Sequence, residues 1–197
     1  RGLISFYSND VNQIENLKKK LNRLFGINGH VYIDNRVHKR YKLFFISKSL
    51  ANFFERVGVP KGNKTNSAYG VPSWILGGNN RLKTEYLRGF FTAEGYIYST
   101  KSENKGVRWR IGIEQYKNES IKENCKSYME QLRTMLKTFE IDSSPVRFDG
   151  YNIRKDGTKS VGARFDIEKP SFGNFYKYIG FDHVEKQRKL LLAMRGA

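Results

Sequence analysis

The chain has 197 residues, of which 39% are hydrophobic and 14% aromatic, which is enough for a folded core and excludes a disordered chain. Its 36 lysines and arginines outnumber its 19 acidic residues, and the formal net charge of +17 favours a phosphate backbone as partner, although a basic protein of the ribosomal kind would carry similar charge. The single cysteine, Cys125, excludes an internal disulfide and a cysteine-based zinc cluster, and no apolar run reaches the about 20 residues of a membrane span.

The first part of the chain predicts a strand, a helix, two strands and a short helix. Ile14, Leu21 and Leu24 belong to an apolar series at helical spacing in the first of these helices. Asn9 or Asp10 is expected to cap that helix. The expected elements are strands at 3–8, 31–34 and 41–46 and helices at 11–25 and 49–57. The glycine-rich residues 60–80 have the character of a linker.

The order of elements returns after residue 80, preceded by one additional helix. The expected elements are helices at 80–94, 119–139, 172–179 and 184–194 and strands at 96–99, 107–115, 146–154 and 160–167. Gly95 is expected to end the first of these helices as a left-handed cap. Asp156-Gly157 is a hairpin signal between the last two strands.

The strand at 107–115 has two chemically different faces. Val107, Ile111 and Ile113 alternate with Arg108 and Arg110. Because successive side chains in a strand point to opposite faces, the alternation predicts a core-facing side, which also carries Trp109, and a basic side.

The two parts of the chain repeat one another. The series Asn52-Phe53, Val57-Gly58-Val59 and Lys64 recurs as Asn174-Phe175, Ile179-Gly180-Phe181 and Lys186, displaced by 122 positions (from 52 to 174). The order of elements is kept as well: strand, helix, two strands, helix, lysine. The sequence therefore predicts two copies of one fold, the first at 1–70 and the second at 81–197, with a linker at 71–80.

Glu94 occupies an unusual position at the end of its helix. The partial negative charge of the last carbonyls disfavours a carboxylate there, which suggests a compensating cation such as a divalent metal. Gly89 and Ala93, one turn apart, form a strip where a second helix could approach closely. Spacing alone also fits an ordinary amphipathic helix with a surface glutamate.

The residues Leu87-x-Gly89-x-x-x-Ala93-Glu94-Gly95 resemble the signature of the LAGLIDADG homing endonucleases, although Thr92 stands where an acid is often found. The resemblance implies an α+β fold of two pseudo-symmetric αββαββα halves that form a DNA-binding saddle around two packed motif helices. It also implies a metal-dependent endonuclease, associated with an intron or intein, that hydrolyses a long double-stranded DNA target. A non-cleaving DNA-binding protein or an RNA maturase of the same fold is the alternative.

The resemblance also assigns roles to individual residues. Glu94 and the backbone of Gly95 would bind Mg²⁺, with two or three ions shared with a second carboxylate. Lys64 and Lys186 match the family's active-site lysine, although each could be an ordinary surface charge. Gln115 matches a polar position that orders solvent near the metals, and Ser8 is its counterpart in the first copy. The residues expected to contact DNA are Arg36, Arg40, Lys42, Arg108, Arg110, Arg154, Lys155, Lys159 and Arg164.

The carboxylate equivalent to Glu94 in the first copy would fall before Arg1, so the first half is expected to lack its motif helix. Either that segment was removed, another chain completes the site, or the protein binds DNA without cutting it. A monomer, or a chain paired with the segment that supplies the helix, is expected. With no signal peptide visible, an intracellular location is expected, in the cytoplasm or an organelle.

Overall fold

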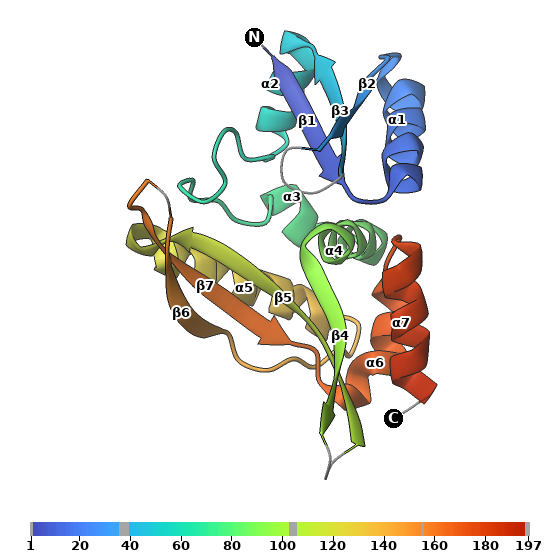
Figure 1. The fold of residues 1–197 in the computed structure, drawn as a ribbon, viewed down its shortest axis with the longest axis vertical. Helices are drawn as coiled ribbons and strands as arrows, with labels where there is room; N and C mark the ends of the chain where they lie inside the picture. Colours follow the sequence, from blue (N-terminus) through green and yellow to red (C-terminus); the bar gives the residue numbers. More distant parts are fainter. Residues whose placement is uncertain (1, 36–39, 103–105, 155, 196–197) are drawn as a thin grey trace. The chain divides into compact units, whose positions relative to one another are not determined.

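The computed structural model describes residues 2–35, 40–102, 106–154 and 156–195, and the chain forms two compact units (Figure 1). The first unit is Arg1–Val59 and the second is Pro60–Ala197. Residues 60–80, expected to have linker character, belong to the second unit, where Val71 and Ile75 are buried in its core. The assignment of 1–70 and 81–197 to two copies stays a prediction.

The first unit is a three-stranded antiparallel sheet with two helices. Its elements are β1 (Leu3–Ser8), α1 (Val11–Phe25), β2 (His30–Asp34), β3 (Arg40–Ile46) and α2 (Lys48–Arg56), and the strand order is β1-β3-β2. The Asp10 side chain caps α1 by accepting a hydrogen bond from the Asn12 amide, and Gly26 ends the helix at φ 65°. Both helix boundaries are therefore confirmed.

The core of the first unit contains Ile14, Leu21, Leu43 and Phe45. Leu24, which belongs to the same apolar series, is 65% exposed, so the series does not lie wholly on the buried face. At 3.6 residues per turn, Leu24 is rotated by about 80° around the helix from Ile14, which takes it off the buried face.

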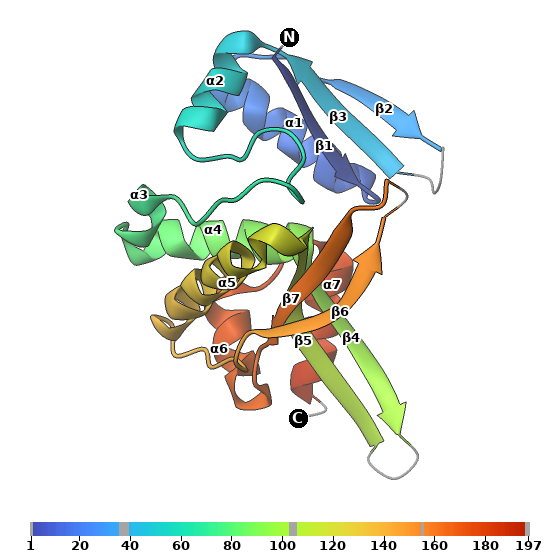
Figure 2. The same ribbon diagram turned by 90° about the vertical axis from the view of Figure 1, so that its left-hand side faces the viewer.

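The second unit is a four-stranded antiparallel sheet covered on one side by helices (Figure 2). Its elements are α3 (Ser73–Leu76), α4 (Asn80–Glu94), β4 (Gly95–Ser102), β5 (Gly106–Asn118), η1 (Glu119–Ile121), α5 (Lys122–Lys137), β6 (Arg147–Ile153), β7 (Lys159–Asp166), η2 (Lys169–Ser171), α6 (Phe172–Asn174), η3 (Phe175–Ile179) and α7 (Val184–Arg195). The strand order is β4-β5-β7-β6. Within this order, β5-β7-β6 has the same topology as β1-β3-β2 in the first unit, and both units have the expected α+β character.

The core of the second unit joins the helices to one face of the sheet. Leu87 and Phe91 of α4, Leu132 of α5 and Ile111 and Ile113 of β5 are all fully buried within it. Val107, expected on the same face, is 55% exposed, because it pairs with Lys101 near the end of the β4–β5 hairpin. The strand β7 pairs with β5 only from Gly112 onward, where Asp166 lies opposite, so Val107 lies in a part of β5 that does not pair with β7. The inward prediction for Val107 is therefore wrong.

Two of the expected helices differ from expectation only in detail. The expected helix 119–139 begins as a 3-10 turn and continues as α5, and the helix at 172–179 finishes in a π-helical turn before Gly180. The hairpin glycine, Gly157, has a φ of 78°. Cys125 is buried. Among the helices that the structure describes, none is long and apolar enough to cross a membrane.

Candidate active site and nucleic-acid interface

The candidate active site lies where α4 passes directly into β4. Leu87 and Phe91 anchor α4 in the core, whereas the side chain of Glu94, the last residue of the helix, is exposed. Gly95 has φ −73° and ψ 152°, which is extended backbone, so the prediction of a left-handed cap is wrong. A glycine is needed here for a different reason: a Cβ at this position would lie 2.5 Å from the Phe91 carbonyl oxygen.

Lys186 of α7 secures this helix end. Its ammonium donates hydrogen bonds of 2.7 Å to the carbonyl oxygens of Thr92 and Gly95. The Thr92 hydroxyl oxygen in turn accepts a bond of 2.9 Å from the Asp182 amide. A cation at the negative end of a helix is electrostatically favourable, and it satisfies carbonyls that have no partner within the helix. Burial lowers the pKa of Lys186, while the nearby Glu94 carboxylate acts in the opposite direction.

The Glu94 carboxylate has two neighbours that the sequence singled out. The Gln115 side-chain amide donates to Oε2 at 3.3 Å, and the Lys64 ammonium lies 3.9 Å from Oε1. The Glu94 side chain nevertheless remains 39% exposed. The structure thus brings Glu94, Lys64 and Gln115 together, whereas the Lys186 ammonium contacts the main chain on either side of Glu94.

Lys117 is a member of this cluster that the sequence reasoning missed. It is 1% exposed, and its ammonium donates to the carbonyl oxygens of Lys64 and Ser67, the latter at 3.0 Å. It also lies 3.6 Å from the centre of the Tyr69 ring. Burial lowers the pKa of Lys117 to about 8, and the Lys64 charge acts in the same direction, against Cys125 and Glu94. Its place in the alternation Ile111, Ile113, Gln115, Lys117 would have put it on the core side of the strand.

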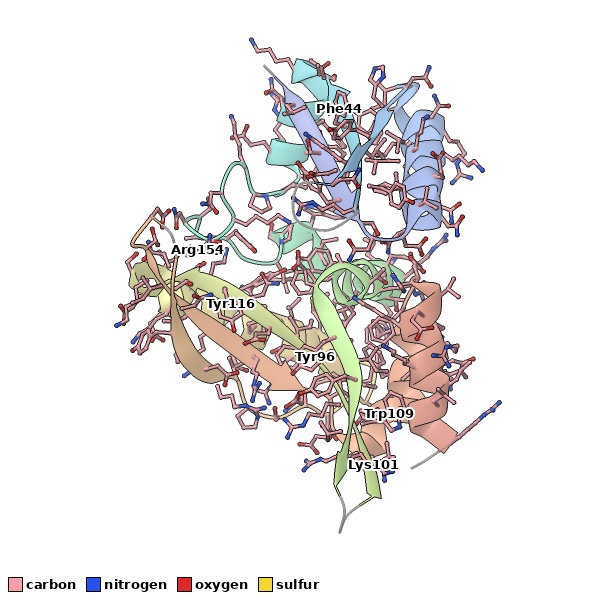
Figure 3. The ribbon with its side chains drawn as sticks, in the orientation of Figure 1. Phe44, Tyr96, Lys101, Trp109, Tyr116 and Arg154 are labelled. Atoms are coloured by element: carbon pink, nitrogen blue, oxygen red, sulfur yellow. The ribbon has the colours of Figure 1, made fainter. Side chains whose placement is uncertain are left out.

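The opposite face of the second unit's sheet is rich in arginine and tyrosine. We call this the open face; it is formed by Tyr96 and Tyr98 of β4, Arg108, Arg110 and Tyr116 of β5, Arg147 of β6 and Arg164 of β7, which the strand registers align. Tyr96 and Tyr116 lie on the opposite side of β5 from Trp109, which packs against the core (Figure 3). The predicted outward direction of Arg108 and Arg110 is confirmed by this register.

Asp166 organises the open face. One oxygen of its carboxylate accepts a hydrogen bond of 2.5 Å from the Tyr96 hydroxyl, and the other accepts one of 2.6 Å from Arg147 and lies 4.0 Å from Arg110. Burial, together with the bond to Asp166, raises the pKa of Tyr96 above its usual range. Arg147 and Arg110 are therefore held beside Asp166 before any ligand arrives.

Other basic residues expected to contact DNA also have partners within the chain. Arg164 pairs with Asp149 at 2.9 Å, and Arg154 donates to the Thr65 hydroxyl at 2.8 Å. Lys159 lies 3.2 Å from Glu119 and 3.7 Å from the centre of the Tyr151 ring. Each of these three cations therefore already has a partner within the chain.

In the first unit, Arg40 and Lys42 lie on the sheet face opposite the core residues Leu43 and Phe45. Arg40 pairs with Asp34 at 3.1 Å, and both cations lie over the Tyr7 ring. The Ser8 hydroxyl donates to Gln13 at 2.6 Å. Arg36 and Lys155, also expected to contact DNA, lie outside the described residues.

Within the part of the chain that the structure describes, no group of three or more histidines, cysteines, aspartates or glutamates could hold a metal ion. An ion at Glu94 would therefore need other oxygen atoms, such as backbone carbonyls, waters or phosphates, to complete its ligands.

Comparison with known proteins identifies relatives of the whole chain. Residues 81–180, half of the chain, match the LAGLIDADG-like domain family. The tRNA-splicing ligase RtcB of Pyrococcus abyssi is 30% identical over 202 residues, which cover 96% of this chain and 21% of that protein. The replication factor C small subunit of Methanocaldococcus jannaschii is 32% identical over 147 residues, covering 68% of this chain and 8% of that protein. The chain thus spans about a fifth of the length of the ligase.

Two further similarities complete the comparison. The DNA-directed RNA polymerase subunit Rpo1N of M. jannaschii is 30% identical over 155 residues, covering 77% of this chain and 11% of that protein. The crystal structure of the N-terminal LAGLIDADG domain of WhiA aligns over 96% of this chain and 77% of that one, with 14% identity and a TM-score of 0.48.

Proposed function

Because this chain belongs to the LAGLIDADG-like domain family, we propose that it is a homing endonuclease that binds a long double-stranded DNA site and hydrolyses it in a metal-dependent reaction. LAGLIDADG-like domains bind DNA and are often nucleases. The observation that carries the proposal is the position of Glu94 at the end of the motif helix, with Lys64 and Gln115 beside its carboxylate.

The relatives support the interpretation that this segment is an element inserted into different host proteins. The similar segment makes up between 8% and 21% of three proteins named as an RNA ligase, a replication factor and an RNA polymerase subunit. These names share no activity, so the segment itself is what the three have in common. A segment that travels between unrelated host proteins is the behaviour expected of a homing endonuclease of the intein type.

The residues at the end of α4 fit a magnesium ion. Mg²⁺ prefers oxygen ligands and is commonly held by one or two carboxylates together with waters and substrate phosphates. Glu94 is partly exposed, and its contacts at 3.3 Å and 3.9 Å leave its oxygens accessible. The Gly95 carbonyl accepts a hydrogen bond from Lys186, but a carbonyl oxygen has a second lone pair. A second carboxylate, from a second motif helix, is proposed to share the two or three ions.

The chain's own residues have separate roles in the proposed reaction. Glu94 would hold the ion, which would supply Lewis-acid polarisation of the scissile phosphate. The Gln115 amide orients solvent beside that carboxylate. The Lys64 ammonium stabilises the negative charge that develops on the phosphate oxygens. Lys186 is proposed to act with Lys64, in addition to holding the backbone on either side of Glu94.

The open face is proposed to contact the DNA. A β-ribbon fits the major groove, and arginine recognises guanine through two hydrogen bonds. Arg108 and Arg110 project from this face, so the replacement of either one that contacts a guanine should cost about 1–3 kcal/mol at one base position. Arg40 and Lys42 are proposed to do the same from the first unit's sheet. Double-stranded DNA is therefore the proposed partner.

The test compares Glu94→Gln with Glu85→Gln. Both changes remove one negative charge from α4, but the Glu85 carboxylate pairs with Arg88 instead of the cluster. Residues 1–197 are first used to select a duplex site from a randomised DNA library. Mg²⁺ binding to the complex and cleavage by the natural protein that contains these residues are then measured. Glu94→Gln should bind DNA normally but lose Mg²⁺ binding and cleavage, whereas Glu85→Gln should retain both.

Three outcomes would contradict the proposal. Undiminished cleavage by Glu94→Gln would remove Glu94 from the reaction. Tight duplex binding with no Mg²⁺-dependent cleavage by the natural protein would favour the non-cleaving DNA-binding alternative, and a preference for single-stranded RNA would favour the maturase.

A further inference from the structure

The segment that carries Lys64 has no regular secondary structure of its own. Residues 64–69 form a turn followed by irregular backbone, and the Lys64 side chain is 63% exposed. A lysine on such a segment samples many positions unless the backbone beneath it is fixed. The distance of 3.9 Å between Lys64 and Glu94 therefore depends on what holds residues 64–69.

The buried side chain of Lys117 holds residues 64–69 in place. Its ammonium donates hydrogen bonds to the main-chain carbonyls of Lys64 and Ser67 and lies over the Tyr69 ring. One buried side chain therefore contacts the beginning, the middle and the end of the segment. The neighbouring residue of β5, Asn118, adds a backbone bond of 2.9 Å from its amide to the Thr65 carbonyl.

The charge of Lys117 is expensive to bury and is not explained by an ion pair. No carboxylate of a described residue lies within ion-pair distance of its ammonium, although Glu94 and Cys125 act on it electrostatically from farther away. Carbonyl dipoles and an aromatic face replace water around the cation. Methionine would fill the same space without a desolvation cost, so a structural core alone does not require lysine here.

We propose that Lys117 is a positioning residue: it fixes residues 64–69 through their carbonyls so that the Lys64 ammonium stays beside Glu94. The effect on cleavage rests on the proposed function, whereas the effect on the segment does not. The bonds made by Lys117 connect β5, which also carries Gln115, to the segment that carries Lys64. A single strand thus sets the distance of both side chains from Glu94.

The first test measures amide hydrogen exchange in Lys117→Met and, as a control, Lys122→Met. Lys122 is a nearby lysine whose ammonium lies over the Phe148 ring. The amides of Asn66 and Tyr69 are hydrogen-bonded within or next to the segment and report its order. Their exchange should accelerate at least tenfold in Lys117→Met and stay unchanged in Lys122→Met, with the amides of α5 unaffected in both.

The second test is a double-mutant cycle for cleavage by the natural protein. Lys117→Met should lower kcat by about 10²-fold with little change in KM, because misplacing a catalytic group costs about this much. The double variant Lys64→Met/Lys117→Met should be no slower than Lys64→Met alone, since Lys117 acts through Lys64. A variant that weakened the fold in general would instead add its effect to that of Lys64→Met.

The outcomes separate the inference from the proposed function. Unchanged exchange at Asn66 and Tyr69 in Lys117→Met would overturn the inference, whether or not the protein cleaves DNA. If the natural protein does not cleave DNA, the proposed function fails, and accelerated exchange would still support the positioning role. If Lys117→Met does not fold, Lys117→Gln, which keeps a donor for one carbonyl, is measured in the same way.

Discussion

Replacing Lys186 with methionine should destabilise the second unit, because the substitution removes the ammonium that caps α4 and keeps the apolar stem. In the wild-type protein the carbonyl oxygens of Thr92 and Gly95 each accept a bond of 2.7 Å from this group. Both carbonyls lose their charged donor in the variant. The Asp182 amide remains bonded to the Thr92 side chain, so one tie to the helix end persists.

The size of the effect follows from these contacts. A hydrogen bond to a charged group contributes about 1.5–3 kcal/mol, so two such bonds contribute about 3–6 kcal/mol. Part of this is offset in the variant because methionine no longer requires burial of an ammonium, which is the cost that lowers the pKa of Lys186. We therefore expect a loss of about 2–4 kcal/mol. At roughly 3 °C per kcal/mol, Tm should fall by about 6–12 °C.

Thermal and urea unfolding, followed by circular dichroism, measure this loss. The matched control is Lys189→Met, on the same helix, where the lysine is partly exposed and lies 4.0 Å from Glu185. A surface pair of this kind contributes less than about 1 kcal/mol. If Lys186→Met unfolds within about 0.5 kcal/mol of Lys189→Met, the two bonds to the end of α4 do not stabilise the fold and the reasoning is refuted.

Three other predictions concern the same unit and its ligand. Gly95→Ala should destabilise the fold, because the new Cβ would lie 2.5 Å from the Phe91 carbonyl oxygen. Gly89→Ala, whose new Cβ would have nothing within 4 Å, should stabilise α4 by up to about 1 kcal/mol. Equal unfolding free energies of the two variants would contradict this. The pKa of Lys117 is lowered to about 8 from 10.5, so between these two pH values the unfolded chain keeps a proton that the folded chain has released. The unfolding free energy should therefore rise by up to about 3 kcal/mol between pH 8 and pH 10.5. Urea titrations should show this rise in the wild type but not in Lys117→Met. Duplex DNA binding should weaken by about three to five orders of magnitude between 50 and 200 mM salt if six to ten phosphates are contacted, and a flat response in a fluorescence anisotropy titration would argue against the proposed DNA-binding mode.

Local signals in the sequence were sufficient for most elements of the fold. The alternation along β5 placed Ile111 and Ile113 in the core and Arg108 and Arg110 on the open face, because side-chain direction in a strand depends only on position. Asp10 marked the start of α1 because its side chain bonds to a backbone amide two residues away.

Only the tertiary structure decided which groups surround Glu94. Lys117 contacts carbonyls about fifty residues earlier in the chain, and Lys186 contacts carbonyls about ninety residues earlier, so neither contact leaves a local pattern. Gly95 was expected to turn the chain with a positive φ, but its backbone is extended, and a Cβ there would lie 2.5 Å from the Phe91 carbonyl oxygen four residues earlier. The two lysine contacts depend on how distant segments pack, whereas the sequence by itself reports the energetics of neighbouring residues.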